Sequence, residues 1–75
     1  MTAFEMIKLA LENADETVKS VIALYATGDE LGLVVSVDKG EDGIHEPAVF
    51  ISGFNNPETD NRIYEFNLVT KTWRY

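Results

Sequence analysis

The chain has no cysteine and only one histidine, so its fold cannot rely on disulfide bridges or on a cysteine- or histidine-based metal site. Its length is 75 residues. A domain of this size buries only roughly 60% of its unfolded surface, and such domains usually need help from a staple or a second subunit. The hydrophobic share of 45% is ordinary for a globular protein. We therefore expect a single domain over residues 1–75, either stable alone or stabilised as a homodimer.

A helix is predicted to begin at Ala3. Thr2 and Glu5 have the spacing of a capping box, in which each residue bonds to the backbone of the other. Apolar residues follow at helical spacing and are expected to face the core: Phe4, Ile7, Leu11 and Ala14. Glu5, Lys8 and Glu12 are expected to face solvent.

The segment up to Gly28 allows two interpretations. The helical spacing can continue through Val18, Ile22 and Tyr25, giving a helix that is long for so small a domain. Alternatively, the helix ends near Asn13 and residues 17–27, rich in β-branched and aromatic side chains, form a strand. Gly28-Asp29 would then be a two-residue hairpin turn. This turn would pair Tyr25 with Gly32, Leu24 with Leu33, Ile22 with Val35 and Lys19 with Asp38. We favour the hairpin.

The rest of the chain is typical of strands. Residues 30–38, 47–54 and 61–68 are apolar or alternating segments, and residues 71–75 close the chain after a short turn. The last dozen residues, "YEFNLVTKTWRY", resemble the hairpin of a kelch blade, in which an Asn-led turn precedes a Trp. The chain shows no repeat of the kelch period, so the resemblance implies a shared turn and no kinship. The predicted fold is α+β, with an N-terminal helix on an antiparallel sheet of four or five strands.

The stretch "DKGEDGIHE" gathers Asp38, Glu41, Asp42 and Glu46 around the only histidine, His45. It begins like an EF-hand loop, but Gly40 stands at the third position and Val49 at the twelfth, where oxygen ligands belong. We expect no metal site. Acid–base catalysis needs a pocket that shifts pKa values, and a glycine-rich solvated loop does not provide one. Phosphate-loop and nucleophile-elbow patterns are also missing from the sequence, so we expect no enzyme activity and no cofactor.

Charge guides the functional hypothesis. The net charge of −7 disfavours direct binding to nucleic acid or anionic membranes and favours basic protein partners. In the hairpin topology, one end of the sheet would collect Asp15, Glu16, Asp38, Glu41, Asp42 and Glu46, offset by Lys39 and Lys71. Carboxylates on a rigid edge can present charge as phosphates do. Small acidic inhibitors of DNA-handling machinery, including phage anti-restriction and anti-CRISPR proteins, act this way as a class. No residue motif here identifies such a family.

The C-terminal segment offers a second surface. Trp73 and Tyr75 share one face of a strand that also carries Lys71 and Arg74. These aromatic side chains either complete the core or form an edge that pairs with another chain.

The leading hypothesis is a non-enzymatic module that inhibits or regulates a basic partner protein, of which a nucleic-acid-binding protein is one example, through Asp38, Glu41, Asp42 and Glu46. The alternative is a subunit that self-associates through the terminal strand or through an apolar outer sheet face comprising Val21, Ala23, Tyr25 and Val34. The sequence carries no basic leader and no long apolar span, so we expect a cytoplasmic protein.

Overall fold

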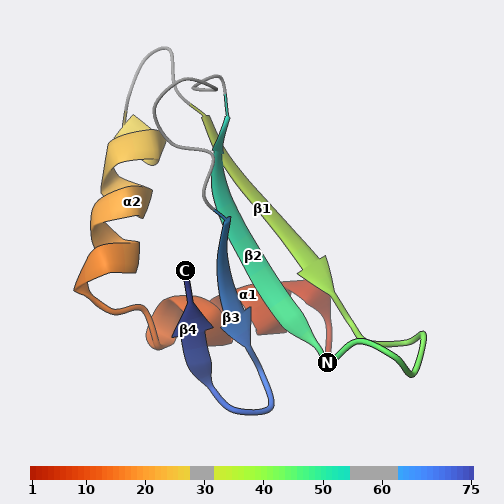
Figure 1. Cartoon of the computed structure of the whole chain (residues 1–75). Helices are drawn as coiled ribbons and strands as arrows, with labels where there is room; N and C mark the ends of the chain where they lie inside the picture. Colours follow the sequence, from red (N-terminus) through yellow and green to blue (C-terminus); the bar gives the residue numbers. More distant parts are fainter. Residues whose placement is uncertain (28–31, 55–62) are drawn as a thin grey trace.

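The chain folds as α+β, with helices on one side of an antiparallel sheet (Figure 1). The computed structural model describes residues 1–27, 32–54 and 63–75. Their elements, in chain order, are α1 (Ala3–Glu12), α2 (Glu16–Thr27), β1 (Gly32–Asp38), β2 (Ala48–Phe54), β3 (Ile63–Asn67) and β4 (Thr72–Arg74). The four strands lie in the order β1-β2-β3-β4, each antiparallel to the next. The predicted fold class, the meander from residue 32 onwards and the terminal hairpin are confirmed.

Helix α1 begins as the capping box predicts. The Glu5 amide donates to the Thr2 hydroxyl at 3.1 Å, and the Thr2 amide donates to the Glu5 carboxylate at 2.9 Å. This backbone hydrogen bond from Thr2, together with its side-chain bond, lowers the pKa of Glu5. The helix ends with Asn13 as its C-cap. Both ends of α1 therefore agree with the interpretation that stops the helix near Asn13.

The buried face of α1 is not the predicted one. Met6 and Ala10 are buried, at 1% and 0% exposure, whereas Phe4 is 76% and Leu11 47% exposed. Glu5, Lys8 and Glu12 are exposed, as predicted. Two apolar stripes compete on this helix because apolar residues occur on most of its circumference. The stripe through Met6 is the one buried because it meets Val49 and Phe66 of the sheet.

The predicted strand over residues 17–27 is wrong, because this segment is the helix α2. The long single helix is also wrong, since residues 13–15 separate α1 from α2. Asp15 explains the restart: its carboxylate accepts from the Val18 amide at 2.9 Å, and its carbonyl accepts from the Lys19 amide, as an N-cap does. The predicted pairs of residues 19–25 with β1 do not form, and β1 is an edge strand. The proposed turn at residues 28 and 29 lies outside the described residues.

One face of the sheet packs against the helices. Val37, Val49, Phe66 and Trp73 lie in one row across the four strands and face the helices. A second row, Val35–Ile51–Tyr64, shares that face. Val18 and Val21 of α2 are also buried, and Val21 packs against Tyr64. The hydrophobic core therefore lies between the two helices and one face of the sheet.

The opposite face of the sheet carries no described helix. Its rows run Val34–Ser52–Ile63 and Ser36–Phe50–Glu65–Arg74, and Val34 and Ile63 are 40% and 57% exposed. The predicted outer apolar face is therefore correct for Val34 only. Val21 is buried in the core and Ala23 is exposed on α2, while the side chain of Tyr25 is not described. None of the described helices is long and apolar enough to cross a membrane.

Candidate functional site: the acidic loop

The acidic loop, residues 38–46, leaves β1 at Asp38 and returns to β2 through Pro47. Two glycines shape it, because Gly40 and Gly43 have φ of +71° and +74°, values that other L-residues rarely adopt. A Cβ at Gly40 would lie 2.7 Å from the His45 carbonyl oxygen, whereas a Cβ at Gly43 would meet nothing within 4 Å. The loop therefore closes on itself at Gly40, and only glycine fits there.

Asp42 organises the tip of the loop. Its carboxylate accepts from the amides of Ile44 at 2.9 Å and His45 at 3.0 Å, and it contacts the imidazole Nδ1 of His45 at 2.5 Å. The hydrogen bonds from His45, first the backbone and then the side chain, hold the pKa of Asp42 far below its usual range. The same carboxylate raises the pKa of His45 through a hydrogen bond and through charge. The Asp42 carboxylate is therefore ionised at neutral pH and held in position by three hydrogen bonds.

Hydrogen bonds also hold the carboxylates of Asp38 and Glu46 in place. Asp38 accepts from the Gly40 amide at 2.8 Å, and Glu46 accepts from the Asn67 side-chain amide at 2.6 Å. The Asn67 side-chain oxygen in turn accepts from the Val69 and Thr70 amides of the β3–β4 turn. Glu41 makes no hydrogen bond or ion pair with any described residue. Three of the four predicted contact residues are therefore held by the loop or the sheet.

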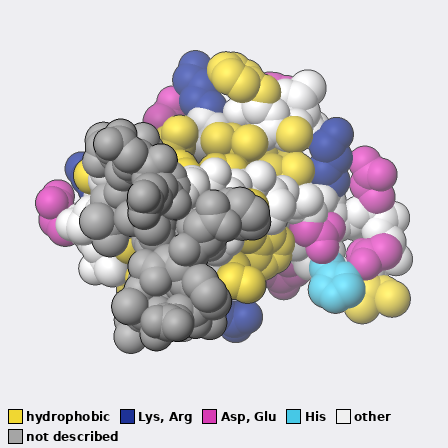
Figure 2. Space-filling model, turned by 90° about the horizontal axis from the view of Figure 1, so that it is seen from above, with side chains coloured by type: hydrophobic (Ala, Val, Ile, Leu, Met, Phe, Trp, Pro, Cys, Tyr) yellow, Lys and Arg dark blue, Asp and Glu magenta, His cyan; other side chains and the backbone are white. Residues whose placement is uncertain are grey.

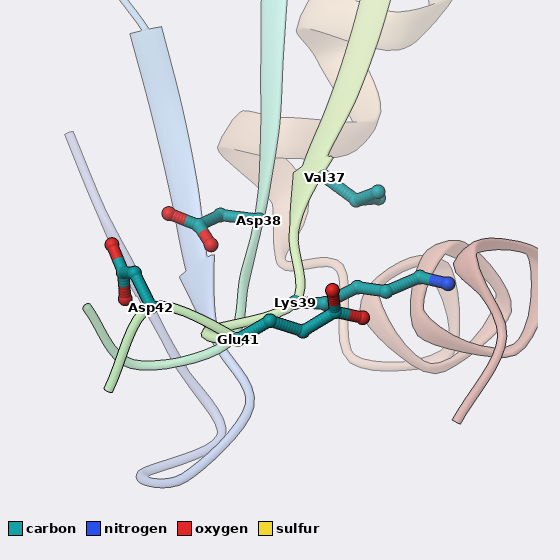
Figure 3. A pocket seen from close by; sticks show the side chains of 5 residues that line it. All are labelled: Val37, Asp38, Lys39, Glu41 and Asp42. Atoms are coloured by element: carbon teal, nitrogen blue, oxygen red, sulfur yellow. The ribbon is translucent and has the colours of Figure 1, made fainter. Parts of the chain in front are cut away.

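A hollow of about 440 Å³ lies beside the start of this loop, lined by Val37, Asp38, Lys39, Glu41 and Asp42. Figure 3 shows Asp38 and Asp42 projecting to one side, whereas Val37 and Lys39 extend to the other. The lining is mainly charged and open to water. Among the described residues, no group of three or more His, Asp or Glu side chains is placed to hold a metal ion. The arrangement presents fixed negative charge to a cationic group.

A second hollow, of about 560 Å³, lies where the loop meets the open face of the sheet. Ile44, Phe50 and Arg74 are among the residues that line it. Ile44 is 83% exposed, and Figure 2 shows the histidine among acidic side chains with an exposed hydrophobic one next to it. Ile44 is not among the contact residues predicted from the sequence. The signal was an isolated apolar residue between Gly43 and His45 in an otherwise polar loop.

The other predicted acidic residues lie elsewhere. Asp15 and Glu16 begin α2, and the Tyr75 hydroxyl donates to the Asp15 carboxylate. Tyr75 follows β4, at the opposite edge of the sheet from β1. The predicted convergence of Asp15 and Glu16 with the acidic loop depended on a strand at residues 17–27, and it is wrong for the same reason. Glu16 forms an exposed ion pair with Lys19 at 3.7 Å.

The two C-terminal aromatic residues are bound to the body of the protein. The Trp73 ring packs on Phe66 with centroids 5.2 Å apart, and its indole N–H donates to the Asn13 carbonyl at 2.9 Å. The Tyr75 ring contacts Tyr64 edge-on at 5.5 Å. Trp73 therefore completes the core and joins the α1–α2 junction to β4, in agreement with the first of its two predicted roles.

Comparisons with known proteins give no family assignment: the chain matches no protein-family model, no curated protein and no solved structure.

Proposed function

We propose that the protein is a non-catalytic protein-binding module that docks its acidic loop on a basic surface of a partner. Asp38, Glu41, Asp42 and Glu46 would make the principal contacts. The module would act stoichiometrically, by covering a basic surface such as a nucleic-acid-binding groove and so inhibiting or regulating the partner. The observation that carries the proposal is the set of hydrogen bonds that fix the Asp38, Asp42 and Glu46 carboxylates.

Fixed charges favour this role for a physical reason. A flexible acidic side chain loses conformational entropy when it pairs with a cation, and this loss often cancels the gain of an exposed ion pair. Three of these carboxylates are already ordered, and the net charge of −7 adds a long-range attraction that speeds encounter with a basic partner. Ile44, 83% exposed in the same loop, supplies an apolar contact that charge alone lacks.

The test is capture of partners from a lysate over a series of salt concentrations, with the captured proteins identified by mass spectrometry. The variant E41Q/E46Q removes two loop charges, and the control E12Q/E16Q removes two charges from the helices. We expect specific capture to weaken with salt, to weaken further with E41Q/E46Q, and to be retained by the control. Capture that is indifferent to salt, or equal for the two variants, would contradict the proposal.

Self-association through the open sheet face is the second candidate. Val34 and Ile63 are exposed there, and Phe50 lies between them and the acidic loop. A face-to-face contact between two copies would cover this apolar surface, which a small domain gains stability by burying. Light scattering over a dilution series separates the two candidates. A dimer that persists at low concentration and is dissociated by Val34→Lys, with no basic partner captured, would favour this one.

A further inference from the structure

A third hollow, of about 400 Å³, has a chemistry opposite to that of the acidic loop. It lies between α1, the start of β2 and the β3–β4 turn, and its walls include Met6, Leu9, Pro47 and Leu68. Met6 is 1% exposed, and Leu9 and Leu68 are partly buried against the core around Val49 and Phe66. The apolar part of the hollow is thus an open edge of the hydrophobic core.

Two lysines, Lys39 and Lys71, also line this hollow, and no carboxylate does. The chain has 6 Lys and Arg against 13 Asp and Glu, so a hollow with two cations and no carboxylate in its lining departs from the composition of the chain. Among the described lysines and arginines, Lys19 and Arg74 pair with Glu16 and Glu65, whereas Lys8 forms no ion pair. Neither Lys39 nor Lys71 forms an ion pair with a described residue, and Figure 3 shows Lys39 extending away from Asp38 and Asp42.

The backbone at Lys71 adds a separate observation. Lys71 has φ of 58° and is the only described residue other than glycine with a positive φ. Glycine or asparagine would occupy this position at lower cost. The positive φ belongs to the β3–β4 turn, which the Lys71 amide closes by donating to the Asn67 carbonyl at 2.7 Å, and the turn leaves Lys71 lining the apolar hollow.

We propose that this hollow binds an aliphatic carboxylate of the size of a medium-chain fatty acid. The hydrocarbon chain would lie on Met6, Leu9 and Leu68, and the carboxylate would lie between Lys39 and Lys71. The volume falls within the roughly 300–1,000 Å³ of small-molecule pockets. The ligand would extend the core at its open edge and neutralise two cations that have no acidic partner in the described structure. The site shares Lys39 with the acidic loop but includes none of the loop's carboxylates, and it does not depend on the function proposed for that loop.

The experiment is a titration of the full chain with decanoate below its micelle concentration, followed by methyl NMR and thermal unfolding. Decan-1-ol serves as the neutral ligand of equal chain length. We expect decanoate to shift the methyl resonances of Met6, Leu9 and Leu68 and to raise the Tm by several degrees at saturation. Decan-1-ol should bind about fivefold more weakly, because it lacks the charge that the lysines attract.

Matched variants complete the test. K39Q/K71N removes both ammonium groups and keeps a residue that tolerates positive φ, so its fold should be retained. We expect it to weaken decanoate binding about fivefold to tenfold. The control K19Q/R74Q removes two cations that are paired elsewhere and should leave the affinity unchanged. Equal affinity for the two ligands, equal affinity for the two variants, or no methyl shift at all would overturn the proposal. A dilution series without ligand gives one more control. If the methyl resonances of Met6, Leu9, Leu68 and Ile44 shift with protein concentration, the acidic loop of a second copy occupies the hollow, and the proposal is overturned.

Discussion

The acidic loop and the C-terminal strand β4 were both selected from the sequence as contact surfaces, and the structure treats them differently. Trp73 and Tyr75 contact Phe66, Tyr64, Asn13 and Asp15, so β4 connects residues about sixty positions apart. The acidic loop bonds mainly within itself, through Asp38, Asp42 and His45. The long-range contacts of Trp73 and Tyr75 stabilise the fold. The local hydrogen bonds of the acidic loop instead shape a surface that stays exposed to a partner.

The largest expected effect is on the side of stability. Trp73→Ala removes the ring from Phe66 and leaves the Asn13 carbonyl without its donor, so it should lower the free energy of unfolding by about 2–3 kcal/mol. Urea denaturation measures this change. Arg74→Ala, at the neighbouring exposed position, is the control and should stay within about 0.5 kcal/mol. Equal losses for the two variants would show that the contacts of Trp73 do not anchor β4 to the core.

Within the acidic loop, the two glycines form a matched pair. Both would force alanine into a positive φ, which costs about 1 kcal/mol, but only Gly40 would also bring its new Cβ against the His45 carbonyl. We expect Gly40→Ala to cost about 2 kcal/mol and Gly43→Ala about 1 kcal/mol, measured by thermal unfolding. If the order is reversed, the loop is not closed at Gly40 as described.

The helix cap at Asp15 should have an intermediate effect. Asp15→Ala removes the acceptor of the Val18 amide and the partner of the Tyr75 hydroxyl, and it should cost about 1 kcal/mol. Asp15→Asn keeps an acceptor oxygen and should cost less than half as much. Chemical denaturation of the two variants gives the comparison. A strand at residues 17–27 would make both substitutions neutral, so this pair also tests the helix α2.

The Asp42–His45 pair should have the smallest effect on the stability of the protein. Its main effect should be on the pKa of His45. NMR titration should give His45 a pKa above 6.5, and Asp42→Asn should return it towards that value. A raised histidine pKa stabilises the loop below the unfolded value of 6.5, and the contribution is lost as the pH rises through the folded pKa. The lowered pKa of Asp42 stabilises the loop above 3.8, and that contribution is lost as the pH falls through the folded pKa. The pair is therefore most favourable between about pH 4 and 6.5. If the pKa of His45 is unchanged in Asp42→Asn, the two side chains do not interact in solution.

Local patterns were read correctly wherever the determining contacts are local. The Thr2–Glu5 capping box, the end of α1 near Asn13 and the Asn67-led turn before Trp73 were all predicted and are all present. Each depends on hydrogen bonds between residues two to four positions apart, and such bonds form from the adjacent sequence alone.

Residues 17–27 were read wrongly because two local signals conflicted. The β-branched residues Thr17, Val18 and Val21 favour a strand, but Asp15 at the N-cap and Glu16 in the first turn favour a helix. Burial of Val18 and Val21 on the sheet at helical spacing stabilises α2, because tertiary packing outweighs a propensity difference of a few tenths of a kcal/mol per residue.

The sequence by itself determined the fold class, the strand order after residue 32 and the acidity of the loop, since alternation, turn chemistry and charge are properties of neighbouring residues. Tertiary structure alone decided which stripe of α1 is buried, that Asp15 and Glu16 lie apart from the acidic loop, and that Trp73 belongs to the core. Those outcomes depend on which distant surface each segment meets, and burial against that surface contributes more free energy than any local preference.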